Sequence, residues 1–313
     1  MLRLVARRLL VSIPLVLVVS AISFVLEALI PGNAAESILG PSATPSAMAQ
    51  LNRQLGLDEP ITVQYWHWLN HLLHGSLGTS VENGQSVFAE LNVRLPVTLS
   101  LLGGAIVVAI LLGCGAGLFS ALRGGIAGKV VDVLAVPGLA IPSFWLGLLL
   151  IAGFAVTWRL FPTTGFVAFT QSPVEWARSL ALPVLALGLG QMTVLAKQTR
   201  DAMLDVLASP FIHSLRANGI TERRIVFKHA VRNAAIPVVT VAGLLVIGAL
   251  TGAVVIEEVF GLPGLGSLAV GATGAHDLPI VQGVALYFTL IVVAVNLFVD
   301  LAYGWLNPKV RGR

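Results

Sequence analysis

The sequence predicts an all-α, multi-pass membrane protein with six transmembrane helices. Of its 313 residues, 56% are hydrophobic and only 11% are charged, and the mean hydropathy is +0.89. A helix needs about 20 mostly apolar residues to cross the hydrocarbon core of a bilayer. Apolar runs of about this length recur at 9–30, 96–120, 131–156, 180–196, 236–256 and 279–302. The fourth run is the least regular, because it is short and contains Pro183 and Gln191.

The first run follows three arginines, Arg3, Arg7 and Arg8, and so has the order of charges found in a secretory signal. Its apolar part spans 9–30, whereas the apolar part of a signal peptide has about 7–15 residues. A retained anchor is therefore favoured over a cleaved signal. With six spans, both termini then lie on one side of the membrane.

The distribution of basic residues predicts which side that is. Of 19 Lys and Arg residues, only Arg53, Arg94, Arg159 and Arg178 fall on the side away from the termini. Short cytoplasmic loops carry the excess of Lys and Arg in membrane proteins, so we expect both termini to be cytoplasmic. The net charge of +4 is then a topology signal, and it gives no reason to expect nucleic acid as a partner.

The runs divide the chain into four parts. An N-terminal tail and the first span occupy 1–30, and a long external segment occupies 31–95. Spans two to six form a core domain over 96–302, and a cytoplasmic tail follows at 303–313. Pro96 fits the first turn of the second span, where a missing N–H costs little.

Motifs for catalysis and cofactor binding fail in this chain. The stretch ALRGGIAGKV (121–130) is no phosphate loop, because Arg123 stands where the first glycine belongs and Val130 where a hydroxyl belongs. The lone cysteine, Cys114, lies in an apolar run. His67, His71 and His74 would share one helical face, but further ligands for a metal are missing nearby, so a polar stripe on an interfacial helix is favoured. We expect no enzyme and no metal or cofactor bound by this chain.

The cytoplasmic loop over 197–235 contains clear helix start and stop signals. Ser209 and Pro210 fit an N-cap followed by proline at the first helical position, and Gly219 fits a C-terminal stop. They predict a short helix over about 210–218. The apolar side chains near one of its faces are Phe211, Ile212 and Leu215.

A second helix is predicted to begin after Thr221 and to continue through ERRIVFKHAVRNAA, with Pro237 marking the start of the fifth span. Two interpretations of this basic loop remain open. Its cations can lie against anionic lipid, or the short amphipathic helix can dock in a groove on a partner.

The same loop carries a family resemblance. LRANGITERRIVFKHAVRNAAIP (215–237) resembles the cytoplasmic-loop pattern of permease subunits of bacterial ABC importers for dipeptides, oligopeptides and nickel. Other stretches resemble the same family in the same order, and they are LIPGN (29–33), LGLDEPITVQYWHWL (55–69), GSLGTS (75–80), IPSFWLGLLLI (141–151), EEVFGLPGLGSL (257–268) and NLFVDLAYGWLNPKVR (296–311). The resemblance covers essentially the whole chain and is to the B-type (DppB/OppB-like) permease.

The resemblance implies a type I ABC importer permease (MetI-like) fold in the bacterial inner membrane. It also implies the partners: a second, C-type permease, two cytoplasmic ATPase subunits that bind ATP and Mg²⁺, and an external solute-binding protein, with lipid around the spans. The expected substrates are di- and oligopeptides. Nickel, haem-type compounds and oligosaccharides are alternatives within the same family.

The resemblance further implies that the loop docks on an ATPase subunit. The residues concerned are Phe211, Ile212, His213, Ser214, Leu215, Arg216, Ala217, Asn218, Gly219, Ile220, Glu222, Arg223 and Arg224. Gly219 matches the family's loop glycine. Two departures are HSL (213–215), where many importers have Glu-Ala-Ala, and Asn218 in place of a frequent Lys. Pathway shape is assigned to Pro142, Gly147, Pro263 and Gly264, for which ordinary close packing is the alternative.

Two other classes of protein are considered. An ion-coupled secondary transporter would work without an ATPase and usually shows inverted repeats, which the sequence lacks. An intramembrane enzyme or scaffold would need converging acids, His or Ser at membrane depth, and no such set is evident.

Overall fold

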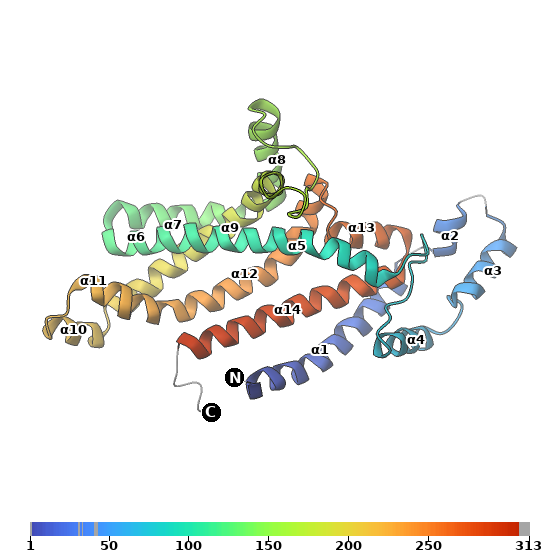
Figure 1. The fold of residues 1–313 in the computed structure, drawn as a ribbon, viewed down its shortest axis with the longest axis horizontal. Helices are drawn as coiled ribbons and strands as arrows, with labels where there is room; N and C mark the ends of the chain where they lie inside the picture. The colour runs from blue at the N-terminus through green and yellow to red at the C-terminus, as the bar shows by residue number, and fades with distance from the viewer. Residues whose placement is uncertain (1, 31, 33, 41–42, 307–313) are drawn as a thin grey trace. The chain divides into compact units, whose positions relative to one another are not determined.

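The protein is built from helices, which the computed structural model describes over residues 2–30, 32, 34–40 and 43–306 (Figure 1). Within these residues, β pairing is limited to an isolated bridge between Thr79 and Ser86. The chain forms two compact units. A core unit consists mainly of Leu99–Leu262 and Ala294–Arg313, and an N-terminal unit consists of Arg3–Thr98 and Pro263–Val293.

The elements are divided between the two units. The N-terminal unit contains α1 (Leu2–Ala28), α2 (Ala34–Leu39), α3 (Pro45–Leu55), α4 (Ile61–Leu73), the start of α5 (Val87–Val108), α13 (Leu265–Ala275) and the start of α14 (Leu278–Leu306). The core unit contains the π-helix η1 (Ala109–Cys114), α6 (Gly115–Arg123), α7 (Gly125–Ala140), α8 (Ser143–Leu150), the π-helix η2 (Ile151–Thr157), α9 (Pro173–Leu207), α10 (Pro210–Ala217), α11 (Glu222–Arg224), the π-helix η3 (Ile225–Ala230) and α12 (Val231–Phe260).

Five of the six predicted spans are helices long and apolar enough to cross a membrane. They are Leu10–Ala28, Val87–Arg123, Pro173–Leu207, Glu222–Phe260 and Leu278–Leu306. The prediction of an all-α membrane protein is thus confirmed, and the irregular fourth run is one 35-residue helix.

The third predicted span, 131–156, is divided. Helix α7 ends at Ala140, and Pro142 precedes α8, which continues as η2. Its second part, Ser143–Thr157, is a continuous apolar helix that is shorter than the other five. Proline disfavours helical backbone in the residue before it and lacks the N–H that would join the two helices. The count of six spans therefore holds only approximately.

The predicted helix start at Pro96 is wrong, and the helix predicted after Thr221 continues through Pro237. Pro96 lies inside α5, which begins at Val87, and Pro237 lies inside α12, which follows η3 and α11 without a break. At the first site, Val87 and Leu91 are fully buried, so packing extends the helix to the N-terminal side of the proline. Tertiary packing commonly overrides a local signal of this kind.

The core unit is arranged around α9, which packs against η1, α6, α7, α8 and α12. Small residues allow this close approach. At Gly117 of α6, a Cβ would lie 2.3 Å from the carbonyl oxygen of Ala196 in α9. A cluster of buried apolar side chains then fills the space beside α9, and it includes Leu195, Met203, Ile212, Ile225 and Val238. We call this group the loop-root cluster, because several of its members, among them Ile212 and Ile225, belong to the loop that follows α9.

The N-terminal unit brings together residues that are far apart in the sequence. Val87 and Leu91 of α5 pack with Leu265 of α13 and Ile280 of α14 in one buried cluster. Asp277, which is 2% exposed, accepts a hydrogen bond from the Ser80 hydroxyl. This carboxylate also accepts hydrogen bonds from the backbone N–H groups of Glu82 at 3.3 Å and Ile280 at 3.4 Å. The segment 80–82 is thereby joined to the start of α14.

Candidate coupling loop

Helix α10 lies at the turn between α9 and α11, where the sequence predicts the docking helix (Figure 1). Ser209 is the N-cap residue and Pro210 is the first helical residue, as predicted. The Ser209 hydroxyl, however, donates to the Val206 carbonyl oxygen at 2.6 Å and does not cap α10. The start of α10 is therefore fixed by the proline and by the end of α9.

The C-terminus of α10 is closed by Gly219, as predicted. Its φ of 72° is in the left-handed region, which glycine adopts without a steric cost. The N–H of Gly219 donates to the Arg216 carbonyl at 2.9 Å, and the N–H of Ile220 donates to the Leu215 carbonyl at 3.2 Å. This pair of bonds is the Schellman arrangement, which satisfies the last carbonyls of a helix.

One face of α10 is inserted into the loop-root cluster. Ile212 is fully buried, and Leu215 and Ile220 pack against the same cluster while half-buried. Phe211 lies at the edge of this face, because on a helix of 3.6 residues per turn it points about 40° from Leu215 and about 100° from Ile212. Its side chain is 42% exposed and lies near the ring of His229, with centroids 6.3 Å apart.

The opposite surface of α10 carries polar and basic groups. Phe211, His213, Ser214, Arg216 and Ala217 are all exposed, and so are Asn218 and Gly219. Beyond the turn, Arg223 and Arg224 of α11 are exposed as well, whereas Ile225 and Val226 immediately after them are buried. The loop thus presents an exposed, mixed aromatic and cationic surface on a buried base.

A two-point ion pair connects the two sides of the Gly219 turn. Arg216 Nε lies 2.6 Å from Glu222 Oε1, and Arg216 Nη2 lies 3.3 Å from Glu222 Oε2. The hydrogen bond to this carboxylate raises the pKa of the Arg216 guanidinium above its ordinary value. Exposed pairs contribute little stability, so the pair mainly orients α10 relative to α11. The sequence analysis did not predict this ion pair. The sequence feature that could have indicated it is an arginine and a glutamate on opposite sides of the glycine that ends the helix.

Comparison with known proteins identifies the family. Residues 109–312 match the model of the binding-protein-dependent transport system inner membrane component, and residues 1–102 match the model of the N-terminal part of such membrane components. The chain belongs to this permease family.

Individual relatives are similar over nearly their whole length. A protein of Brucella abortus (strain 2308), assigned as the permease of a peptide transport system, is 41% identical over 309 residues, or 98% of each chain. The glutathione transport system permease protein GsiC of Salmonella choleraesuis (strain SC-B67) is 38% identical over 312 residues, or 99% of each chain.

A solved structure shows the same fold. The MetNI methionine ABC transporter in inward-facing conformations matches 70% of this permease and 97% of its own matched chain. The TM-score is 0.52 and the sequence identity is 17%. The likeness confirms the predicted MetI-like fold class.

The four residues assigned to pathway shape are divided between the two units. Pro142 and Gly147 belong to the core unit of the permease, and Pro263 and Gly264 belong to its N-terminal unit. A Cβ at Gly147 would lie 3.1 Å from the Phe260 ring, so close helix packing accounts for that glycine. A pathway role for the four residues stays a prediction.

Proposed function

We propose that this chain is one of two permease subunits of an ATP-driven importer that carries short peptides or related small solutes across the bacterial cytoplasmic membrane. Membership of the permease family supports the class of protein, and relatives named for peptide and glutathione transport support the class of solute. In this proposal a solute-binding protein delivers the substrate. Two separate ATPase subunits hydrolyse ATP with Mg²⁺.

The loop around α10 is the proposed contact with an ATPase subunit. This proposal rests on one observation about α10. The helix has an exposed surface on one side, and on the other side Ile212 is fully buried in the loop-root cluster. A helix that only marked topology would need cations but no buried base. A rigid base lets a push on α10 reach the helices that share the cluster.

The helices that receive such a push are α9 and α12. They flank the loop directly and pack along one another in the core unit. Closure of the ATPases would move α10, and α9 and α12 would rearrange between inward-open and outward-open states. ATP can drive this equilibrium only if it binds the two states with different free energies. The buried Ile212 and Ile225 hold the loop in register during that movement.

The proposed orientation places the loop and both termini in the cytoplasm. Most of the cations fall on that side of the six spans. The proposed docking surface contains Phe211, His213, Arg216, Asn218 and Gly219, all of them exposed. Arg223 and Arg224 would anchor the start of the following helix near the membrane surface.

Uptake by proteoliposomes tests the proposal. Liposomes containing this chain and its permease partner are loaded with ATP, with and without the ATPase subunits, and given binding protein and radiolabelled Ala-Phe. We expect uptake only with the ATPases present. Equal uptake without them, driven by an ion gradient, would show a secondary transporter.

The role of the loop is tested by replacing Gly219 with a bulky residue. Nothing lies within 4 Å of a Cβ at Gly219, so Gly219→Phe meets only backbone strain of about 1–2 kcal/mol but obstructs docking. Gly84→Phe is the matched control, because Gly84 has a similar φ of 69° and equally open surroundings in the N-terminal unit. We expect Gly219→Phe to abolish uptake with normal membrane insertion and Gly84→Phe to retain it. Unchanged uptake in both variants would refute docking.

A further inference from the structure

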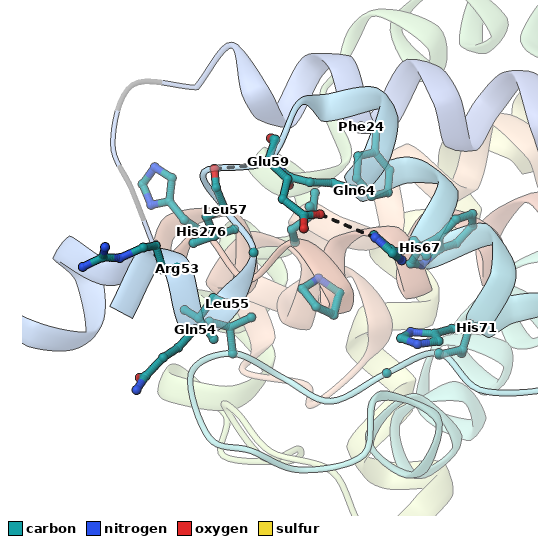
Figure 2. A pocket seen from close by; sticks show the side chains of 17 residues that line it. Phe24, Arg53, Gln54, Leu55, Leu57, Glu59, Gln64, His67, His71 and His276 are labelled. Carbon is teal, nitrogen blue, oxygen red and sulfur yellow. Dashed lines mark hydrogen bonds and ion pairs between the residues drawn. The ribbon is translucent and has the colours of Figure 1, made fainter. Parts of the chain in front are cut away.

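The N-terminal unit contains a cavity of about 460 Å³ (Figure 2), and none of the residues that line it belongs to the coupling loop. Its walls come from the end of α1, the last turn of α3 with the connection to α4, one side of α4, the stretch 77–81 and the connection from α13 to α14. This volume is within the range of about 300–1,000 Å³ that small-molecule sites occupy.

One side of the cavity is apolar and aromatic. Phe24 and Trp68 line it together with Leu55, Leu57 and Pro279. The rings of Phe24 and Trp68 are held edge to face, with centroids 6.0 Å apart. Trp68 is only 7% exposed, and its indole N–H is buried without a hydrogen-bond partner. A buried indole N–H usually has an acceptor, so this wall offers a hydrogen-bond donor that a bound ligand could satisfy.

The other side carries a carboxylate and histidines. Glu59 and His67 point toward one another, with Oε2 and Nε2 3.5 Å apart (Figure 2). Both side chains are more than two-fifths exposed, so this long contact leaves the Glu59 carboxylate free to accept further donors. Gln64 fixes the backbone beside it, because Nε2 of Gln64 donates to the Glu59 carbonyl at 2.8 Å. His71 lies one helical turn beyond His67 and also lines the cavity.

A cation stands at the rim. Arg53 lines the cavity from the last turn of α3, and its Nε donates to the Ala49 carbonyl at 3.2 Å. In Figure 2 its guanidinium extends away from the centre of the cavity. The site therefore combines an apolar wall, a carboxylate inside and a guanidinium at its edge.

The histidines do not indicate a metal. Over the described part of the chain, no group of three or more His, Cys, Asp and Glu side chains is placed to hold a metal ion. The pattern instead fits a zwitterion that also carries an apolar group. A carboxylate binds an ammonium and a guanidinium binds a carboxylate through charge-assisted hydrogen bonds, and apolar side chains supply the buried surface.

We propose that this cavity is a binding site for a short peptide substrate in the N-terminal unit of the permease. The peptide's α-ammonium group lies at Glu59, an apolar side chain lies against Phe24, Trp68 and Leu57, and the C-terminal carboxylate faces Arg53 at the rim. The site rests on the proposed function, because it assigns a place on this chain to the peptide that the importer carries.

Photolabelling of the complete transporter tests the site. The transporter is assembled in nanodiscs with both permeases, the ATPases and the binding protein, and it is exposed to Ala-(4-benzoylphenylalanine). We expect labelled peptides of this chain to map to Phe24 or within 53–81 or 276–279, and excess Ala-Phe to prevent the labelling. Label confined to transmembrane residues other than Phe24, or no label on this chain while Ala-Phe uptake proceeds, would overturn the site and leave the proposed function intact.

A paired change in protein and ligand tests the role of Glu59. We expect Glu59→Gln to lower labelling about tenfold, the loss that corresponds to one charge-assisted hydrogen bond. Asp58→Asn is the matched control, since Asp58 is adjacent and exposed but does not line the cavity. The N-acetylated photoprobe, which lacks the ammonium, should label the unmodified protein about tenfold less and should be unaffected by Glu59→Gln.

Two further results separate the alternatives. If Glu59→Gln weakens the cross-linking of the binding protein itself and leaves peptide labelling unchanged, the cavity receives part of that protein and the peptide site is refuted. If the complete unmodified transporter takes up no Ala-Phe in proteoliposomes, the proposed peptide function fails, and the site fails with it.

Discussion

The coupling loop and the cavity region are held together by different kinds of contact. In the loop, the Schellman turn and the Arg216–Glu222 pair join residues no more than six positions apart. In the cavity region, Asp277 and Ser80 are 197 positions apart, and Ser37 and His276, whose side chains lie 3.4 Å apart, are separated by 239. The loop is therefore a locally specified element, whereas the cavity exists only when distant segments have come together.

This difference suits the two proposed tasks. A docking helix must keep its shape while it is pushed, and short-range bonds plus one buried base provide that rigidity. A binding cavity between separate segments can open or close when one of them moves. Asp277 is the position at which the cavity region is most easily weakened, and Ile212 is the corresponding position in the coupling loop.

The largest effect is expected at Asp277. Replacing it with Ala removes the acceptor for the Ser80 hydroxyl and for the N–H groups of Glu82 and Ile280. Leaving buried donors without partners should lower the free energy of local opening of 79–86 by about 2–4 kcal/mol, as measured by hydrogen exchange in detergent. Asp58→Ala, at an exposed position, should change exchange very little. Equal protection in the two variants would show that the long-range contact does not hold this region.

A smaller effect is expected at the base of the loop. Ile212→Val removes one methylene from a fully buried side chain and should reduce the protection of α10 by about 1 kcal/mol. Ile220→Val removes the same group from a half-buried side chain in contact with the same cluster. Its effect should be smaller, since the lost group is partly solvated in both states. If Ile220→Val opens α10 more than Ile212→Val does, the helix is held by the turn and not by its buried base.

The same contrast explains what the sequence could predict. The start of α10 at Pro210, its stop at Gly219 and the restart after Thr221 depend on proline and on backbone conformation, which are local properties. All three positions are confirmed, although neither the Ser209 nor the Thr221 hydroxyl caps its helix. The exposed position of Phe211 was missed, because periodicity alone did not distinguish the edge of an apolar face from its centre. The start of α5 before Pro96 was missed, because the buried side chains of Val87 and Leu91 extend the helix to the N-terminal side of the proline.

The cavity could not have been predicted in this way. His67 and His71 were recognised as a shared helical face, but their neighbours Phe24 and Pro279 come from opposite ends of the chain. A single amino-acid sequence carries no signal that joins such segments. The pairing of 3–98 with 263–293 is likewise absent from the predicted order of parts, which had treated 31–95 as separate.

Site-directed cross-linking from α10 to an ATPase subunit tests the central claim most directly. Cys114 is the only cysteine, so Cys114→Ala provides a background in which Phe211→Cys can be joined to ATPase cysteines by a short bismaleimide. Val63→Cys, exposed on α4, is the control in the N-terminal unit. We predict a cross-link from position 211 whose yield changes when ATP is added, and none from position 63. Absence of a cross-link from α10 in a complex that hydrolyses ATP and transports peptide would contradict the account.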